Sequence, residues 1–298
     1  MKQGCAKSFQ GVKGRVKFKE PLSLHTTFRI GGKASFFIEP EDVVDLRRVV
    51  VSAKRSQMPL KIIGAGSNIL VRDEGVEAAV LKLSAPFFWK TSFDRERVRA
   101  GSGISLGRLQ QTARARSLSG VEFLAGIPGS LGGALVMNAG AWGRCMGDLV
   151  ENVRVMDHNG KIKVIPRGKI RFGYRSSSLA EYIILGARLK LHKKNKKEID
   201  SVLKEYKRLR KEAQDYSSSS AGCVFKNPPG ESAGRLIDLC GLKGKKRGGA
   251  RVSPKHANFI VNQNKAKAVD VLRLMEEIKK KVKQKFNIGL EPEIRIWE

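Results

Sequence analysis

The sequence predicts an α+β fold built from more than one domain, and three observations support this prediction. Amphipathic helix patterns are interspersed with short apolar runs that glycine-rich turns separate. The chain has 298 residues, 41% of them hydrophobic. Single hydrophobic cores stop growing near this length, so about two domains, or three small ones, are expected. Finally, the composition becomes lysine-rich at His192, and we place a domain boundary there.

The first 85 residues have the pattern of a small α/β unit. The segment after Pro40 has acidic residues in its first turn and then apolar residues three to four positions apart, which predicts a helix with one buried face. That face comprises Val43, Leu46, Val50 and Ala53. Predicted strands follow at residues 60–63, 69–71 and 78–83.

Residues 86–192 are predicted to form a second unit that is rich in strands. Ser105 is expected to cap a helix that continues to about Arg116 and ends at Gly120. An Asn-Gly turn at residues 157–160, between two alternating runs, predicts a β-hairpin. The predicted strands are residues 97–100, 151–156, 161–165 and 182–191.

Residues 193–298 are predicted to form a third unit. It begins with a long helix that continues to Lys211, and it ends with the strand-like sequence EIRIW. A second helix is expected after Asn264. Its apolar side is predicted to comprise Val269, Leu272, Ile278 and Val282.

The net charge of +30 favours polyanionic partners, namely nucleic acid, an anionic membrane surface or ligands that carry phosphate groups. Charge alone does not choose among them, and most of the lysines are expected to lie on solvated helix faces. The basic residues are concentrated at 193–211, 243–251 and 279–285. Only 7% of the residues are aromatic and none alternates with these basic runs, which argues against a nucleic-acid-binding surface.

Several other protein classes are disfavoured by the sequence. No window approaches the roughly 18 apolar residues of a membrane span, and the start of the chain lacks the apolar stretch of a secretory signal, so no membrane insertion and a cytoplasmic location are expected. The four cysteines and four histidines are widely scattered. A disulfide scaffold and a metal site are therefore not expected.

Glycine-rich segments are the first candidates for a ligand site. Gly64-Ala65-Gly66-Ser67-Asn68 follows a predicted strand, but Ile69 stands where a dinucleotide fingerprint requires its third glycine. No GxxxxGK[ST] motif exists either. What remains is a turn whose backbone N–H groups can surround phosphate oxygens, with a plain tight turn as the alternative.

The second glycine-rich segment strengthens this interpretation. Gly126-Ile127-Pro128-Gly129-Ser130-Leu131-Gly132-Gly133 cannot be helical throughout, because glycine and proline disfavour helix interiors. Asn138 follows it as a further polar candidate. Two such loops predict a large ligand that contains a diphosphate, although close backbone packing explains part of the glycine content.

Six sequence blocks in a fixed order carry a specific resemblance. They are HTTFRIGGKASFFIEP (25–40), IIGAGSNILVRDEG (62–75), LAGIPGSLGGALVMNAGAWG (124–143), FGYRSSS (172–178), AGCVFKNPPGESAGRLIDLCGLKGKKRGGARVSPKHANFIVN (221–262) and LEPEIRIW (290–297). Together they resemble the UDP-N-acetylenolpyruvoylglucosamine reductase family over nearly the whole chain from about residue 22.

The resemblance implies an FAD-binding fold of the vanillyl-alcohol-oxidase or p-cresol-methylhydroxylase type, with two α/β subdomains at 1–85 and 86–192 and a C-terminal α/β substrate-binding domain at 193–298. It implies non-covalent FAD, held by the two glycine loops, and NADPH as co-substrate. The implied reaction reduces UDP-N-acetylglucosamine enolpyruvate to UDP-N-acetylmuramate in peptidoglycan synthesis, and thereby serves cell wall biogenesis, cell shape and division. A monomer is expected.

The resemblance also implies three catalytic residues. Arg175 matches the arginine that stabilises developing negative charge, and a guanidinium suits this task because it gives two parallel hydrogen bonds to a carboxylate. Glu293 matches an assisting glutamate. A glutamate in this role is useful mainly when it is protonated, so burial is expected to raise the pKa of its carboxyl group. Cys223 stands where the family usually has the serine that donates a proton. From the residues alone, a surface ion pair, an edge-strand carboxylate and a packed apolar thiol remain the alternatives for these three side chains.

The resemblance implies substrate contacts as well. The matching positions are Tyr174, Arg210, Gln214, Lys226 and Asn227. The prolines usual around Gln214 are absent, which leaves the local loop path open, and the short spacing from Arg175 to Cys223 resembles the family type that lacks an extra tyrosine-bearing loop. The competing hypotheses are another flavin oxidoreductase of the same fold and a basic nucleic-acid-binding protein.

Overall fold

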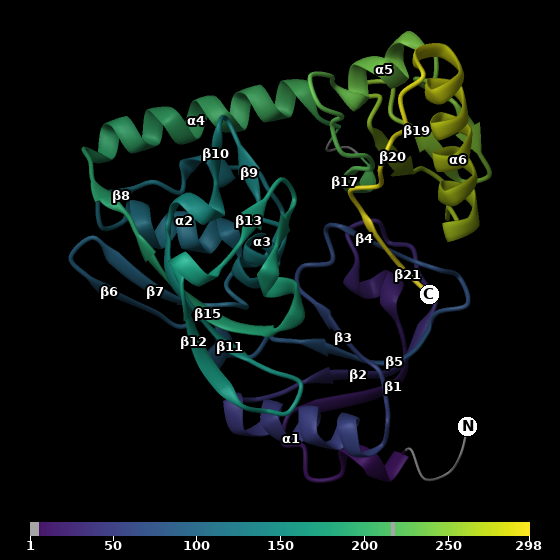
Figure 1. Ribbon diagram of the computed structural model, residues 1–298. Coiled ribbons are helices and arrows are strands. Elements are labelled where there is room, and N and C mark those ends of the chain that lie inside the picture. Colours follow the sequence, from purple (N-terminus) through teal and green to yellow (C-terminus); the bar gives the residue numbers. More distant parts are fainter. Residues whose placement is uncertain (1–5, 216–217) are drawn as a thin grey trace. The chain divides into compact units, whose positions relative to one another are not determined.

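The computed structural model describes residues 6–215 and 218–298, which form two compact units (Figure 1). The first unit comprises the chain up to Phe18, Ser35–Ala65 and Glu77–Arg208; the second comprises Lys19–Ala34, Gly66–Val76 and Leu209–Glu298. The second unit therefore combines two segments from early in the chain with the C-terminal part.

The first sheet of the first unit has the strand order β1-β2-β5-β3. Its strands are β1 (Arg15–Pro21), β2 (Lys33–Glu39), β3 (Leu60–Ile63) and β5 (Val76–Lys82), and the unit boundary passes through β1 and β2 and next to the start of β5. Helix α1 (Val43–Arg55) packs on this sheet through the predicted face, with Leu46, Val50 and Ala53 buried. Its first turn is capped by Asp42, which accepts hydrogen bonds from the N–H groups of Val44 and Asp45.

A second sheet of five antiparallel strands has the order β12-β11-β15-β7-β6. The strands are β6 (Thr91–Asp94), β7 (Arg97–Gly101), β11 (Val150–Met156), β12 (Ile162–Pro166) and β15 (Ile183–Lys190). The predicted hairpin between β11 and β12 is confirmed, since the N–H of Gly160 donates to the carbonyl of Asp157 at 3.0 Å. Gly160 has a φ of 81°, which explains the preference for glycine there.

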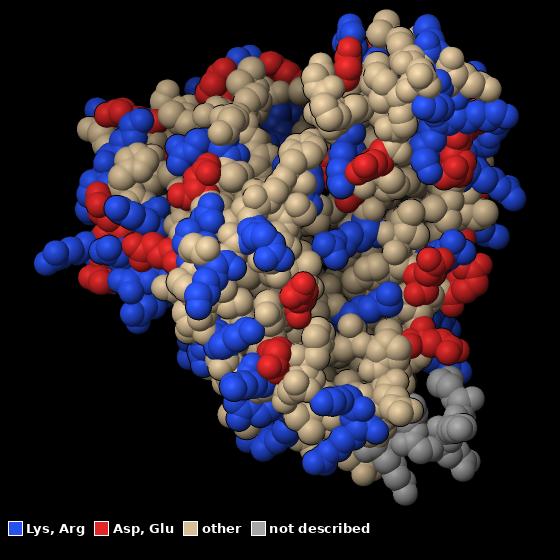
Figure 2. All heavy atoms as spheres, viewed as in Figure 1, with Lys and Arg blue, Asp and Glu red and all other residues tan. Residues whose placement is uncertain are grey.

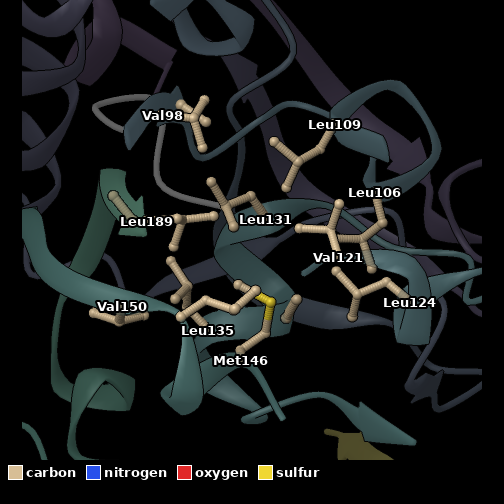
Figure 3. Packing of buried hydrophobic residues seen from close by; sticks show 14 of the residues in the cluster. Val98, Leu106, Leu109, Val121, Leu124, Leu131, Leu135, Met146, Val150 and Leu189 are labelled. Carbon is tan, nitrogen blue, oxygen red and sulfur yellow. The ribbon is translucent and has the colours of Figure 1, made fainter. Parts of the chain in front are cut away.

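Two short helices, α2 (Leu106–Arg114) and α3 (Leu131–Val136), contribute to the largest core of the first unit. Figure 3 shows Leu131 and Leu135 of α3 directed into this core, together with Leu106 and Leu109 of α2. The predicted cap at Ser105 is confirmed. The helix ends at Arg114 rather than Arg116, because Ser117 adopts a left-handed φ of 54° before Gly120 is reached.

Short elements connect these layers. Small two-residue strands are β8 (Leu118–Ser119), β9 (Gly140–Ala141), β10 (Arg144–Cys145), β13 (Phe172–Gly173), β14 (Ser176–Ser177) and β16 (His192–Lys193). Helix α4 (Lys196–Ala213) starts in the first unit and confirms the predicted long helix. Within the first unit it buries only Ile199 and Leu203, so most of its basic side chains face solvent.

The second unit is built around a four-stranded sheet of order β17-β20-β19-β18. Its elements are β17 (Ser219–Cys223), β18 (Lys246–Arg247), β19 (Ala250–Val252), β20 (Phe259–Asn262), α5 (Ala233–Leu239) and α6 (Ala268–Phe286). The predicted C-terminal strand is confirmed as β21 (Arg295–Trp297), which pairs in parallel with β4 (Ile69–Val71).

The predicted apolar side of α6 was partly wrong. Ile278 and Val282 are buried as expected, but Val269 is 39% exposed. The buried face also contains Ala268, Val271, Leu274 and Met275. Val269 lies two positions, or about 200° of helical rotation, from Val271, and therefore points away from this face.

Charged side chains cover much of the surface. Figure 2 shows Lys and Arg scattered over the visible face, with fewer Asp and Glu, among a larger area of other residues. In the first unit, Arg188 contacts Glu151 at 3.0 Å; in the second unit, Arg247 contacts Glu277 at 2.7 Å. In the part of the chain that is described, no helix is long and apolar enough to cross a membrane, and no cluster of His, Cys, Asp and Glu could hold a metal ion.

Candidate active site

Within the first unit, the two predicted glycine loops lie next to each other. A Cβ atom built on Gly64 would lie only 2.5 Å from the Oγ of Ser130. Ser130 also caps α3, because its Oγ accepts a hydrogen bond from the N–H of Gly133 at 3.3 Å. Glycine at position 64 therefore allows the chain after β3 to approach the start of α3 closely.

A third segment, residues 101–106, lies against the second of these loops. The N–H of Leu106 donates to the carbonyl of Gly129 at 3.0 Å, and the N–H of Gly132 donates to the carbonyl of Ser102 at 2.8 Å. The hydroxyl of Ser102 is buried and has no hydrogen-bond partner among the described residues. Such a hydroxyl can donate to a bound molecule or to an ordered water.

These segments fit a bound FAD. They supply closely spaced backbone, little side-chain bulk and one buried hydroxyl that needs a partner, which is what a diphosphate-containing cofactor requires. Of the remaining predicted loop residues in this unit, Ala65, Gly126 and Pro128 are exposed, while Ile127 packs against the core. The sequence analysis did not include Ser102 among the candidate site residues. Gly101 and Gly103, which flank it directly after a predicted strand, could have indicated a third glycine-rich turn.

Replacing Gly64 with alanine is expected to lower FAD binding, because the new methyl group would displace Ser130 and open the cradle. The affinity should fall by about tenfold or more, as for a side chain forced into a packed site. Gly107→Ala is the matched control, since a Cβ at Gly107 would meet nothing within 4 Å. The measurement is FAD titration of the apoprotein, and equal affinity in both variants would contradict the cradle.

Arg175 lies at the tip of a tight hairpin between β13 and β14. Its φ is 54°, a left-handed conformation that is uncommon outside glycine. The side chain is half-buried, and its Nη1 donates to the carbonyl of Gly140 at 3.1 Å. Tyr174, the other residue of the tip, is 54% exposed, and the Arg175 guanidinium lies 5.2 Å from the centre of its ring. This arrangement presents one fixed cation beside an accessible aromatic ring.

Asn138 does not face outward from its loop. It is 8% exposed, its Nδ2 donates to the carbonyl of Gly173 at 3.0 Å, and its Oδ1 accepts from the N–H of Gly147 at 2.9 Å. Its amide therefore ties the start of the Arg175 hairpin to the segment before β11.

In the second unit, the remainder of the first glycine loop contacts the chain itself. A side chain at Gly66, whose φ is 67°, would overlap the carbonyl of His25. Packing alone thus accounts for glycine at this position. Ser67 is half-buried. Asn68 donates from Nδ2 to the carbonyl of Glu293 at 3.1 Å, and its own carbonyl accepts from the N–H of Arg295 at 2.9 Å.

The segment that carries Cys223 lies beside the segment that carries Glu293. The N–H of Glu293 donates to the carbonyl of Val224 at 2.7 Å, and the N–H of Lys226 donates to the carbonyl of Glu291 at 2.9 Å. Cys223 and Glu293 are both half-buried. Two of the three predicted catalytic side chains are thus brought onto neighbouring segments of one unit, while Arg175 belongs to the other unit.

Asn258 fixes the Cys223 segment from its other side. Its Oδ1 accepts from the N–H of Phe225 at 2.9 Å and its Nδ2 donates to the carbonyl of Phe225 at 2.8 Å. Asn258 is held in turn by His256, whose Nδ1 accepts from its N–H at 3.2 Å. Burial of the His256 ring lowers its pKa below the ordinary value, and the charge of Lys243 acts in the same direction. A neutral imidazole keeps Nδ1 able to accept this hydrogen bond.

Of the predicted substrate-binding residues of the second unit, Asn227 is exposed, whereas Arg210, Gln214 and Lys226 are half-buried. Lys226 forms a 3.2 Å ion pair with Glu291, and the Oδ1 of Asn227 accepts from the N–H of Ala233, the first residue of α5. Arg210 and Gln214 contact each other at 3.5 Å near the end of α4.

Comparison with known proteins gives a consistent family. Residues 214–297 match the model of the C-terminal domain of UDP-N-acetylenolpyruvoylglucosamine reductase, and residues 34–165 match the model of an FAD binding domain. These matches confirm the predicted fold, an FAD-binding part followed by a C-terminal domain.

Individual relatives cover nearly the whole chain. UDP-N-acetylenolpyruvoylglucosamine reductase 2 of Symbiobacterium thermophilum is 41% identical over 286 residues, which are 95% of this chain and 92% of the relative. The corresponding reductase of Alkaliphilus oremlandii is 42% identical over 94% of this chain and 93% of its own. The crystal structure of UDP-N-acetylenolpyruvylglucosamine reductase from Thermus caldophilus superposes with a TM-score of 0.83 at 40% identity, covering 96% of this chain and all of that one.

Proposed function

The chain belongs to the UDP-N-acetylenolpyruvoylglucosamine reductase family, and from this membership we infer that it is an FAD-dependent oxidoreductase of peptidoglycan precursor synthesis. We propose that it reduces UDP-N-acetylglucosamine enolpyruvate to UDP-N-acetylmuramate with NADPH. The observation that best supports this reaction is the backbone pairing of the segment that carries Cys223 with the segment that carries Glu293, because both segments belong to the domain that matches the family model.

FAD, when bound, supplies the transfer of a hydride from NADPH to the double bond of the substrate. We propose that the chain holds it non-covalently through Gly64, Ser102 and the 126–133 loop, with the remaining residues of the first loop as further contacts. The task of these residues is to bind the diphosphate and to orient the cofactor.

Arg175 is proposed to stabilise the negative charge that develops toward the carboxylate of the substrate. A guanidinium can give that carboxylate two parallel hydrogen bonds, and the fixed turn geometry means that little reorganisation is needed. Glu293 is proposed to act on the same charge in its protonated form.

Cys223 is proposed to deliver the proton that completes the reduction. A thiol has a reference pKa near 8.5, so it is a stronger acid than the serine hydroxyl that the family commonly uses. Lys226, a cation close to Cys223 in the sequence, forms an ion pair with Glu291.

Asn227, Lys226, Arg210, Gln214 and Tyr174 are proposed to bind the nucleotide part of the substrate. Basic side chains of 193–211 and 243–251 are proposed to attract the phosphates of the substrate and of NADPH, which accounts for part of the net charge. We further propose a cytoplasmic monomer in which residues 1–85 and 86–192 hold FAD and residues 193–298 hold the substrate.

An absorbance experiment tests this function directly. The purified protein is expected to be yellow, NADPH should bleach it, and UDP-N-acetylglucosamine enolpyruvate should restore the colour. Heat denaturation should release all of the flavin into the supernatant, whereas colour in the precipitate would contradict non-covalent binding. A protein that NADPH bleaches but this substrate does not recolour would instead be a flavin oxidoreductase with another substrate.

Replacing Glu293 with glutamine is expected to slow recolouring by substrate by a factor on the order of 10² or more, because an amide is a weaker hydrogen-bond donor to the developing negative charge than a protonated carboxyl group. Bleaching by NADPH should be unchanged. Glu298→Gln is the matched control, since Glu298 is an exposed carboxylate of the same C-terminal segment, paired with Arg72. Stopped-flow absorbance measures both steps, and an equal loss in the two variants would contradict the role of Glu293.

A further inference from the structure

The conformation of Arg175 requires support from its surroundings. The residue occupies a left-handed backbone conformation at the tip of a hairpin whose strands, β13 and β14, have two residues each. Such short strands contribute few hydrogen bonds of their own. A non-glycine residue with a left-handed φ persists only where neighbouring contacts hold it in place.

Contacts with the 135–147 segment provide this support. The hydroxyl of Ser177 in β14 donates to the carbonyls of Leu135 and Val136 at 2.9 and 3.0 Å. On the opposite strand, Gly173 receives the Nδ2 hydrogen bond of Asn138. The two strands that flank the turn are therefore each fixed by one side-chain hydrogen-bonding group.

Asn138 is the more constrained of the two anchors. Its amide oxygen accepts from Gly147 while its amide nitrogen donates to Gly173, so reversing the amide would lose both hydrogen bonds. It is buried, and its own φ of 43° is left-handed. Gly173 is separated from Arg175 only by Tyr174, so a displacement of its carbonyl passes directly to the turn.

We propose that Asn138 is a positioning residue for Arg175, which it holds through the carbonyl of Gly173. This inference rests on the proposed role of Arg175 and replaces the expectation that Asn138 binds the cofactor. Small displacements of a charge-stabilising group have large kinetic effects, since an error of about 1 Å can cost on the order of 10²-fold in rate.

The test uses three variants of the FAD-loaded enzyme. Asn138→Gly removes the amide but suits the left-handed φ, so it separates the hydrogen bonds from backbone strain. Asn138→Asp keeps an acceptor for Gly147 and loses the donor to Gly173. Asn159→Gly is the control, because Asn159 lies in the exposed turn of residues 157–160.

The first measurement is amide hydrogen exchange of residues 172–177. Exchange should accelerate by about tenfold or more in Asn138→Gly and Asn138→Asp and stay unchanged in Asn159→Gly, as expected when a hydrogen bond worth about 1.4 kcal/mol is lost. FAD affinity should remain that of the unmodified enzyme. Loss of FAD with unchanged exchange would overturn the proposal and return Asn138 to cofactor binding.

The second measurement is a double-mutant cycle on the substrate-dependent step. Asn138→Gly should slow this step by roughly 10- to 100-fold on its own and cause no further loss when Arg175 is already alanine. A full additional loss in the Arg175→Ala background would overturn the proposal. If Arg175→Ala alone leaves the step unchanged, the proposed role of Arg175 fails, whereas the exchange measurement still reports on the anchor.

Discussion

The Arg175→Ala substitution is expected to lower the rate of enolpyruvyl substrate reduction by a factor on the order of 10² or more. A loss of this size is typical when a donor that stabilises charge in the transition state is removed. The guanidinium is half-buried and already oriented by the carbonyl of Gly140, so its loss removes a group that needs no rearrangement to act. The preceding step, bleaching by NADPH, should be almost unaffected, because no carboxylate charge develops in it.

Two further variants make this prediction specific. Arg175→Lys should recover only part of the rate, because an ammonium group keeps the charge but cannot give two parallel hydrogen bonds. Arg171→Ala should behave like the unmodified enzyme, since Arg171 is an exposed arginine just before the same hairpin. Stopped-flow absorbance with each reactant separates the two steps. An equal slowing of both steps in Arg175→Ala would contradict the assigned role.

Replacing Cys223 with alanine is expected to remove most of the activity, because a positioned general acid contributes about 10² to 10⁴ in rate. Cys223→Ser should keep substantial activity, since a hydroxyl is the donor that the family commonly uses. Hydrogen bonds to Asn258 on one side and to the 291–293 segment on the other hold the backbone just after Cys223. Neither substitution should therefore shift this backbone.

The pH dependence distinguishes a proton donor from a packed thiol. Only the protonated thiol can donate, so turnover of the unmodified enzyme should fall as the pH rises above the pKa of Cys223, and the serine variant should lack this decline. Cys240→Ser is the control, since Cys240 is a half-buried free cysteine of the same unit. Full activity of Cys223→Ala would make Cys223 a packing residue.

Local sequence patterns predicted most secondary structure because their causes are local. The strand at Leu60–Ile63, the cap at Ser105 and the turn before Gly160 each depend on a few neighbouring residues, and all three were confirmed. The buried face of α6 was less predictable, since it depends on which strands the helix contacts. Val269 is apolar and has the expected spacing from Leu272, and for this reason it was predicted to be buried. Its position in the structure is set by a residue far away in the sequence, because the carboxylate of Asp73 accepts a hydrogen bond from its N–H.

The site residues show the same distinction between local and distant causes. Asn68 and Asn138 were predicted to contact FAD because Asn68 ends the first glycine-rich turn and Asn138 follows the second, and these contacts stay a prediction. In the structure their amides bond to Glu293 and Gly173, which are 225 and 35 residues away in the sequence. A side chain's partners at such separations cannot be derived from one sequence. Close approach of the chain explains the glycine at position 64, where a Cβ would lie 2.5 Å from the Oγ of Ser130.

The parallel pairing of β4 with β21 has a consequence for how the protein is made. Residues 69–71 leave the ribosome long before residues 295–297 exist, and at about 5–20 residues per second the delay is roughly 10 to 45 s. Until β21 has been synthesised, the apolar strand Ile69–Val71 lacks the strand with which it pairs. An exposed, unpaired strand can associate with chaperones or with other nascent chains. The second unit therefore completes its folding only when synthesis reaches Trp297. Slowing translation of the C-terminal third should lengthen this vulnerable interval.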